Sequence, residues 1–290
     1  MNVQIIIKKM DAYEKLMRLD KPIGILLLLW PTLWALWIAS TGFIDWRVTL
    51  IFIAGTVLMR SAGCVMNDIA DLKFDGLVER TKHRPLITKE VSVKEAYILV
   101  AILIFFAFVL VLFLNTQAVL LSICALFLAA TYPLTKRFIA IPQAYLGLAF
   151  GFGIPMAFAA TNESIPLYAW LLLVANVFWA IAYDTEYAMV DRDDDLKIGI
   201  KSSAITFGRY DVFAVMICYA VMLGLLASVG IYLHMKLAFF LGLVVAMILV
   251  LYHYKLIRHR DKTDCFRAFL HNNWLGASVF LGIMCNYGFK

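Results

Sequence analysis

Long runs of apolar side chains, separated by short polar segments, repeat along the whole chain. A helix that crosses the hydrocarbon core of a bilayer needs about 20 predominantly apolar residues, and the runs are close to that length. Only helices and closed barrels satisfy their backbone polar groups in lipid, and continuous runs of this length favour helices. The pattern predicts nine transmembrane helices, over residues 22–41, 48–66, 96–114, 118–134, 139–160, 166–183, 212–233, 237–256 and 268–288.

The composition agrees with a protein that crosses the bilayer many times. Hydrophobic residues make up 63% of the chain and the mean hydropathy is +0.84, whereas a soluble domain is about 45–50% apolar. We predict an all-α fold, in which nine transmembrane helices form a bundle around a central cavity that opens to the cytoplasm. Residues 22–290 form this single domain, and residues 1–21 form an amphipathic segment on the cytoplasmic membrane surface.

The basic residues are distributed unevenly between the two sides of this bundle. Of 26 lysines and arginines, 22 lie in the amino-terminal segment and the loops on that side, whereas only Arg47, Lys236 and Lys290 lie on the other side. The positive-inside rule places the N-terminus in the cytoplasm and the C-terminus in the periplasm. The net charge of +6 reflects this topology, so nucleic acid is not an expected partner. The lack of a transit-peptide pattern favours the bacterial inner membrane.

A first acidic segment follows the second apolar run, at its predicted cytoplasmic end. It reads NDIADLKFD over residues 67–75. Asn67, Asp71 and Asp75 recur every four residues and would share one helical face. Hard oxygen ligands arranged in this way suit Mg²⁺, which keeps several waters and bridges carboxylates to substrate phosphates.

A second acidic segment follows the sixth apolar run. Asp184, Asp191 and Asp195 lie seven and eleven residues apart, which again places them on one helical face. Both segments are on the predicted cytoplasmic side, so they can converge at the inner mouth of the bundle. The pair predicts two Mg²⁺-binding faces rather than two solvated helix ends.

Cations at matching positions favour a diphosphate as the bound group. Arg60 lies inside the second apolar run, where a charge is costly unless it meets an anion. Tyr132, Lys136 and Arg137 place a hydroxyl and two cations at a third cytoplasmic helix end. A diphosphate carries about three negative charges and needs such cations besides the metal. The residues predict a membrane-embedded cavity for an apolar substrate with a diphosphate head.

Three motifs resemble the signatures of the UbiA family of intramembrane prenyltransferases. They are Asn67-Asp68-x-x-Asp71-x-x-x-Asp75, Asp191-x-x-x-Asp195 and Tyr132-x-x-x-Lys136. Their surroundings resemble family members that act on 4-hydroxybenzoate, in residues 20–24 (DKPIG), 29–35 (LWPTLWA), 80–86 (RTKHRPL), 183–185 (YDT) and 191–202 (DRDDDLKIGIKS). The resemblance covers almost the whole chain, and the motifs are specific in combination.

The resemblance implies transfer of a polyprenyl chain from polyprenyl diphosphate to 4-hydroxybenzoate in ubiquinone biosynthesis. The new bond would form at the ring carbon ortho to the hydroxyl, and diphosphate would be released. Mg²⁺ is the implied cofactor. The implied metal ligands are Asn67 and Asp71 for one ion and Asp191 and Asp195 for the other, with Asp68 and Asp75 supporting the first site.

The same resemblance implies roles for the other site residues. Arg60, Tyr132 and Lys136 would bind the diphosphate, and Arg137 would orient the aromatic acid. Asp191 is a candidate acceptor for the proton that the aromatic substrate loses. The catalytic residues implied are Asp71, Asp75, Asp191 and Arg137.

Two alternatives remain open at this point. Another member of the family, with a naphthoate acceptor of the menaquinone type or a haem substrate, would carry the same acids. A cation-coupled or proton-coupled transporter would also need acids in the membrane, although transporters place them near the middle of a span. No obligate protein partner is evident from the sequence.

Overall fold

The computed structural model describes residues 3–76, 81–162 and 164–288, and every regular element among them is a helix. This confirms the all-α prediction. The helices are α1 (Val3–Met17), α2 (Ile23–Ser40), α3 (Trp46–Ala70), α4 (Leu72–Asp75), α5 (Val93–Val111), α6 (Thr116–Thr135), α7 (Pro142–Gly151), α8 (Gly153–Asn162), α9 (Leu167–Ile198), α10 (Ser203–Phe207), the 3₁₀ turn η1 (Gly208–Tyr210), α11 (Asp211–Tyr232), α12 (Leu237–Ile257) and α13 (Lys262–Tyr287).

Eight membrane-crossing candidates, by length and apolar composition, occur within the described ranges, so the predicted count of nine is corrected to eight. The predicted run 268–288 is the one that is not among them. It belongs to α13, which begins with charged residues and continues through His271, Asn272 and Asn273. α13 still packs along α12, with their backbones close together: a Cβ built on Gly282 would lie 3.1 Å from the Cα of Gly242.

The predicted helix over residues 139–160 is two helices, α7 and α8, which meet at Phe152. Pro155 explains the break because it has no N–H to donate to the carbonyl of Gly151, and its ring crowds that carbonyl. α7 packs tightly on α9, since a Cβ on Gly147 would lie 2.8 Å from the Cα of Val177. Residues of both α7 and α8 line the cavity described below.

The ends of the helices place the acidic segments beyond the apolar runs. Asp45 caps the start of α3 by accepting from the backbone N–H groups of Arg47 and Val48. α3 then continues for 25 residues to Ala70. α9 is a single helix of 32 residues that ends where Gly199 adopts a left-handed conformation. Residues 67–75 and 184–195 therefore lie on, or next to, helices anchored in the core.

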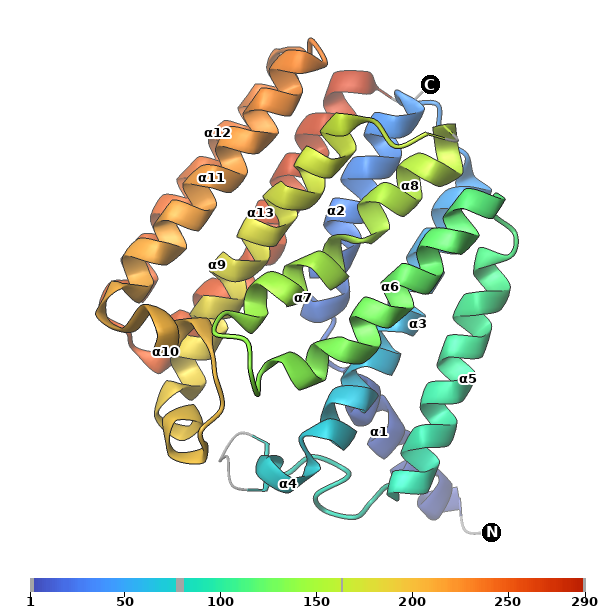
Figure 1. Ribbon diagram of the computed structural model, residues 1–290, viewed down its shortest axis with the longest axis vertical. Coiled ribbons are helices and arrows are strands. Elements are labelled where there is room, and N and C mark those ends of the chain that lie inside the picture. Colours follow the sequence, from blue (N-terminus) through green and yellow to red (C-terminus); the bar gives the residue numbers. More distant parts are fainter. Residues whose placement is uncertain (1–2, 77–80, 163, 289–290) are drawn as a thin grey trace.

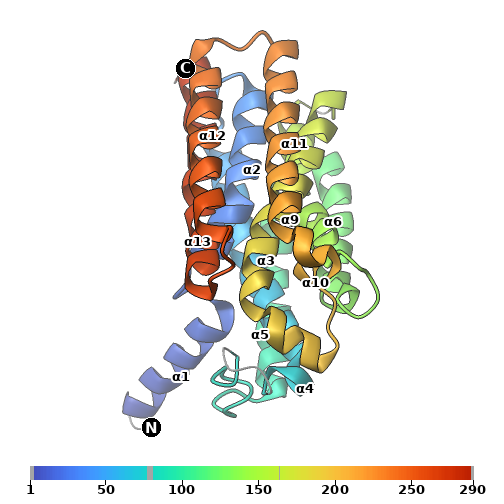
Figure 2. The same cartoon turned by 90° about the vertical axis from the view of Figure 1, so that its left-hand side faces the viewer.

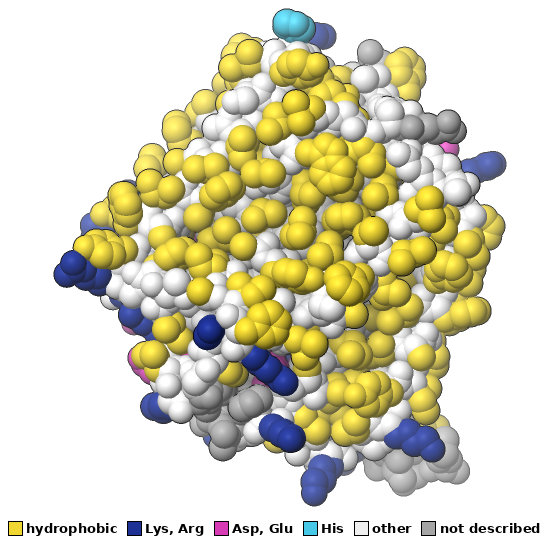
Figure 3. All heavy atoms as spheres, viewed as in Figure 1, with side chains coloured by type: hydrophobic (Ala, Val, Ile, Leu, Met, Phe, Trp, Pro, Cys, Tyr) yellow, Lys and Arg dark blue, Asp and Glu magenta, His cyan; other side chains and the backbone are white. Residues whose placement is uncertain are grey.

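The bundle has two chemically different ends. The N-terminus, α1, α4 and α10 lie at one end, and the C-terminus lies at the other (Figure 1). Hydrophobic side chains cover the middle of the face in Figure 3, while Lys and Arg gather mainly towards the end that carries α4 and α10. Large apolar side chains such as Phe105, Leu120 and Val245 are exposed on the outer helices. These features are typical of a multi-pass membrane protein.

α1 leans away from the bundle at the end that carries α4 (Figure 2). Its inner side is held by Lys9, whose Nζ lies 2.8 Å from a carboxylate oxygen of Glu95, and by the buried Leu16. Ile7 and Met10 on its outer side are exposed. This distribution agrees with an amphipathic segment.

Candidate active site

A cavity of about 1350 Å³ lies between the helices, and both acidic segments line it. Its inner part is apolar, with Phe52, Met59, Val111, Leu126 and Met156 on its walls. Its polar lining includes Arg18, Lys21, Arg60, Asn67, Asp68, Asp71, Asp75, Arg84, Tyr132, Lys136, Gln143, Tyr183, Asp184, Asp191 and Asp195. α3 and α9, far apart in the sequence, thus contribute their acids to one site.

Asn67 and Asp71 lie one helical turn apart at the end of α3. The Asn67 Oδ1 atom is buried and has no hydrogen-bond partner within the described part of the chain. Lys136 Nζ lies 3.3 Å from Asp71 Oδ2. A buried amide oxygen without a partner is unfavourable unless a ligand supplies one. Asn67 and Asp71 are therefore suited to hold a cation between them.

Asp68 and Asp75 are engaged by arginines. Arg18 Nη2 lies 3.0 Å from both carboxylate oxygens of Asp68, and Arg84 Nη1 lies 2.9 Å from one of them. Arg84 also donates to Asp75. Burial raises the pKa of Asp75 above its ordinary value, although Arg84 acts in the opposite direction. The sequence predicts Asp68 and Asp75 as ligands; the structure places their oxygens in an ion-pair cluster beside Asn67 and Asp71.

Asp184, Asp191 and Asp195 follow one face of α9 into the cavity. Asp184 accepts a hydrogen bond from the side chain of Gln143. The acids between them point elsewhere: Asp193 lies 2.9 Å from Lys262 Nζ, and it does not line the cavity. The spacing along α9 therefore decides which acids of the segment reach the site.

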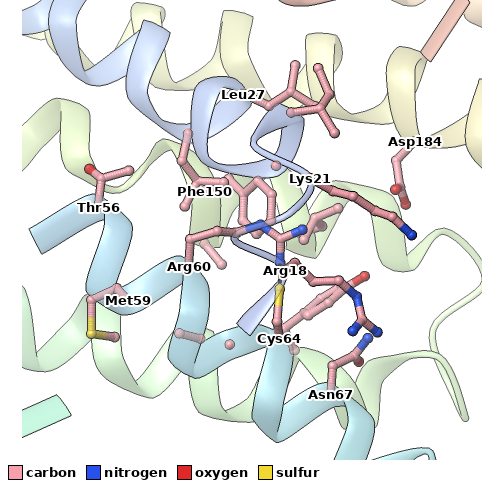
Figure 4. Close-up of a pocket in the computed structure, with 18 of the residues that line it drawn as sticks. Arg18, Lys21, Leu27, Thr56, Met59, Arg60, Cys64, Asn67, Phe150 and Asp184 are labelled. Carbon is pink, nitrogen blue, oxygen red and sulfur yellow. Dashed lines mark hydrogen bonds between the residues drawn. The ribbon is translucent and has the colours of Figure 1, made fainter. Parts of the chain in front are cut away.

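Arg60 extends from α3 beneath α2 (Figure 4). Its Nη1 lies 2.7 Å from Cys64 Sγ, and its guanidinium carbon lies 5.5 Å from the centre of the Phe150 ring. Arg60 Nε is buried with no partner among the residues described. A Cβ on Gly24 would overlap the guanidinium, so the glycine in α2 creates the space that Arg60 occupies. This partly buried cation still has a donor, its Nε–H, to offer to an anion.

Lys136 lies just beyond α6, with its Nζ 5.9 Å from the centre of the Tyr132 ring. Burial opposes its charged form, but Tyr132 and Asp71 outweigh burial and raise the pKa of Lys136 above the ordinary lysine value. Lys136 is therefore a cation at neutral pH. Arg137, next in sequence, is exposed and donates to the carbonyl of Ala70 at 3.2 Å. It does not line the cavity, so the structure does not bring it together with the other predicted site residues.

Several cavity residues were not predicted as site residues. Arg84 and Asp184 lie inside segments that the sequence did single out, the basic motif of residues 80–86 and the second acidic segment. Arg18 comes from the end of α1 and Gln143 from α7, and both stand in sequence contexts without a distinctive pattern. Only the tertiary structure places these two beside the acids.

The residues of the site fit Mg²⁺ better than they fit a metal ion whose ligands all come from protein side chains. In the ranges that the structure describes, no three His, Cys, Asp or Glu side chains converge on a common point. Mg²⁺ is usually bound by one or two protein ligands, with waters and substrate phosphates completing its octahedron. Asn67 with Asp71, and Asp191 with Asp195, are donor pairs of that kind.

The chain belongs to the UbiA prenyltransferase family, whose model matches residues 28–275. This confirms the resemblance seen in the motifs. The chain is similar to 4-hydroxybenzoate octaprenyltransferase of Methylobacillus flagellatus, with 65% identity over 98% of this chain and 96% of that protein. It is also similar to the enzyme of the same name from Aromatoleum aromaticum, with 63% identity over 96% of this chain and 95% of that protein.

Solved structures share the fold. An apo UbiA homologue from Aeropyrum pernix K1 has a TM-score of 0.77 and 26% identity, over 88% of this chain and 96% of that chain. A UbiA homologue from Archaeoglobus fulgidus, solved with GPP and Mg²⁺, has a TM-score of 0.71 and 18% identity, over 94% of this chain and 99% of that chain. At that identity the second likeness concerns the fold alone.

Proposed function

We propose that this protein transfers a polyprenyl chain from polyprenyl diphosphate to the ring carbon ortho to the hydroxyl of 4-hydroxybenzoate, as a step of ubiquinone biosynthesis. One observation carries the proposal: an apolar cavity leads to a site where two pairs of oxygen ligands and partly buried cations meet. That site suits a lipid-like tail with a diphosphate head. The names of the similar proteins support 4-hydroxybenzoate as the acceptor.

Asn67 and Asp71 would hold one Mg²⁺, and Asp191 and Asp195 the other. When bound, Mg²⁺ neutralises charge that develops on the leaving diphosphate. Asp68 and Asp75 fix the arginines around the first pair rather than contributing ligands. This arrangement explains why the motif contains four acids or amides although an ion needs only two of them.

Arg60, Lys136 and Tyr132 would contact the diphosphate oxygens. Their donors stabilise the charge that forms as the allylic C–O bond breaks. The ring carbon of the acceptor then forms the new C–C bond, and its proton passes to a cavity carboxylate, for which we propose Asp191. The apolar walls exclude water, which would otherwise trap the allylic cation. Arg137 lies outside this set, so its role in orienting the aromatic acid stays a prediction.

We propose that the end carrying α4 and α10 faces the cytoplasm of a bacterial inner membrane. Lys and Arg gather at that end, and such residues are retained on the cytoplasmic side. The site would then open to the cytoplasm, and the C-terminus would lie in the periplasm.

The acceptor assignment is tested with washed membranes, octaprenyl diphosphate and Mg²⁺. We expect radiolabelled 4-hydroxybenzoate to be prenylated and 1,4-dihydroxy-2-naphthoate to be left unchanged. Membranes without the protein serve as the control. Prenylation of the naphthoate alone would reject the acceptor and keep the reaction class, and prenylation of neither would reject the proposed function.

Replacing Lys136 by Met is expected to raise the KM for polyprenyl diphosphate by about tenfold, because one charge-assisted contact to the diphosphate is lost. Lys197→Met is the matched control, since Lys197 is exposed and pairs only with Asp194 among the ion pairs described. Steady-state kinetics at varied prenyl diphosphate concentration make the comparison. Equal KM values for the two variants would remove Lys136 from the diphosphate site.

A further inference from the structure

Behind the cavity, four helices meet in a buried polar cluster. Glu186 of α9, Tyr219 of α11, His253 of α12 and Asn272 of α13 are all fully buried. We call these four residues the Glu186 cluster. None of the four lines the cavity, so the reaction described above does not use them.

Tyr219 is the centre of the Glu186 cluster. Its hydroxyl oxygen lies 2.9 Å from Glu186 Oε1, 3.0 Å from Asn272 Oδ1 and 3.1 Å from His253 Nδ1. A tyrosine hydroxyl has a single proton to donate. It can therefore donate to only one of these three atoms, and the other two contacts need protons from the neighbours.

Trp179 fixes the orientation of the Asn272 side-chain amide, because an indole N–H can donate a hydrogen bond but cannot accept one. The Trp179 indole Nε1 donates to the Asn272 side chain at 2.8 Å, so the atom that receives it is the amide oxygen. The Asn272 Nδ2 group donates to Glu186 Oε2 at 2.8 Å and to the carbonyl of Ala268 at 3.0 Å. Since the Asn272 oxygen faces the Tyr219 oxygen, the proton between them must come from Tyr219.

Counting protons then determines the state of Glu186. The Tyr219 proton is used on Asn272, so the contact between Tyr219 and Glu186 Oε1 needs a proton on Glu186. His253 Nδ1 must carry hydrogen for the same reason. An ionised Glu186 would leave two acceptor oxygens facing each other without a proton, at the centre of a buried cluster.

The surroundings of Glu186 hold no compensating cation. The titratable groups that face it are Tyr219 on α11, His253 on α12 and Cys265 on α13. No lysine or arginine among residues 3–76, 81–162 and 164–288 forms an ion pair with it, and His253 Nδ1 is 3.7 Å from Glu186 Oε1. An unpaired buried carboxylate is strongly unfavourable.

We propose that Glu186 is a neutral carboxylic acid in the folded protein, and that through it the Glu186 cluster positions the acidic face of α9. Asp184 and Asp191 point from α9 into the cavity, whereas Glu186 points from the opposite side into α11, α12 and α13. Because α9 is one continuous helix, fixing its rotation at residue 186 also fixes the direction of Asp191 and Asp195. The activity readouts rest on the proposed function; the protonation state does not.

Infrared spectroscopy tests the protonation state directly. Purified protein labelled with ¹³C in glutamate should show a carboxylic-acid C=O band at neutral pH, and Glu186→Gln should lose it. Glu95→Gln is the matched control, because Glu95 pairs with Lys9 and is ionised. Absence of the band in the wild type, or its persistence in Glu186→Gln, would overturn the proposal whether or not 4-hydroxybenzoate is the acceptor.

Substitution tests the positioning role. A glutamine offers Tyr219 an N–H and offers the Asn272 amide an oxygen, so Glu186→Gln should keep both turnover and the half-saturating Mg²⁺ concentration. Glu186→Ala removes both contacts and should raise that concentration by about tenfold, as substitutions of groups that support metal ligands do. Loss of Mg²⁺ affinity in Glu186→Gln, or none in a folded Glu186→Ala, would contradict the role. If Glu186→Ala does not fold, the Mg²⁺ requirement of Glu186→Gln and the infrared band of the wild type decide whether the proposal holds.

Discussion

Asp71→Ala and Asp191→Ala should each reduce prenyl transfer by about 100-fold or more, because on the proposed assignment each substitution would remove one of the two protein ligands of a Mg²⁺ ion that stabilises the leaving diphosphate. The loss should appear in kcat as well as in the Mg²⁺ requirement, since charge on the diphosphate grows only as the C–O bond breaks. Washed membranes, saturating octaprenyl diphosphate and a Mg²⁺ titration provide the measurement.

Asp193→Asn is the control for this loss. Asp193 belongs to the same acidic segment as Asp191, but it pairs with Lys262 and does not line the cavity. We expect its activity and Mg²⁺ dependence to match the wild type. Full activity of Asp71→Ala or Asp191→Ala would reject the assigned metal sites.

Arg84→Met is expected to lower the free energy of unfolding by about 3 kcal/mol, because it leaves buried carboxylates without their counter-charge. The side chains of Arg84, Asp68 and Asp75 are 14%, 2% and 8% exposed. Arg18 continues to neutralise Asp68, so Asp75 is the carboxylate most affected. Unfolding of the purified protein in detergent, followed against denaturant concentration, measures the change.

Arg267→Met provides a matched arginine substitution. Arg267 lies 3.6 Å from Asp264, and both side chains are largely exposed, so their ion pair should contribute no more than about 1 kcal/mol. Adding Asp75→Asn to Arg84→Met should recover part of the lost stability. If Arg84→Met is as stable as Arg267→Met, the ion-pair cluster does not stabilise the first acidic segment.

Most of the helices could be predicted from the sequence because a segment that spans the lipid must be predominantly apolar along its length. The errors have local causes. Hydropathy alone does not register that Pro155 interrupts a run that is mostly apolar. Asn272, one of the polar positions that lower the apolar character of α13, is buried and hydrogen-bonded to Glu186 of α9 and Tyr219 of α11, so it is compatible with the bundle.

The gathering of the acids and most of the predicted cations in one cavity was predictable, because charged residues stand out against apolar sequence. The sequence did not predict which of these residues contact the cavity and which contact other side chains. Asp71 and Asp75 belong to the same four-residue repeat, so spacing does not distinguish them. They differ in their partners, because Arg84 forms an ion pair with Asp75 from a loop. Lys136 and Arg137 are adjacent cations, yet one faces the cavity and the other the end of α3. Glu186 lies between predicted acids, and its separate role depends on partners from three other helices.

The length of α9 has a physical consequence for the membrane around it. A helix of 32 residues extends for about 48 Å, which exceeds the roughly 30 Å of hydrocarbon in a typical bilayer. A thinner or thicker bilayer changes the tilt of such a helix. Tilting α9 relative to α3 would alter the separation between Asn67 and Asp71 at the end of α3 and Asp191 and Asp195 on α9. We therefore expect acyl-chain length in reconstituted vesicles to be a variable that acts on catalysis from outside the protein.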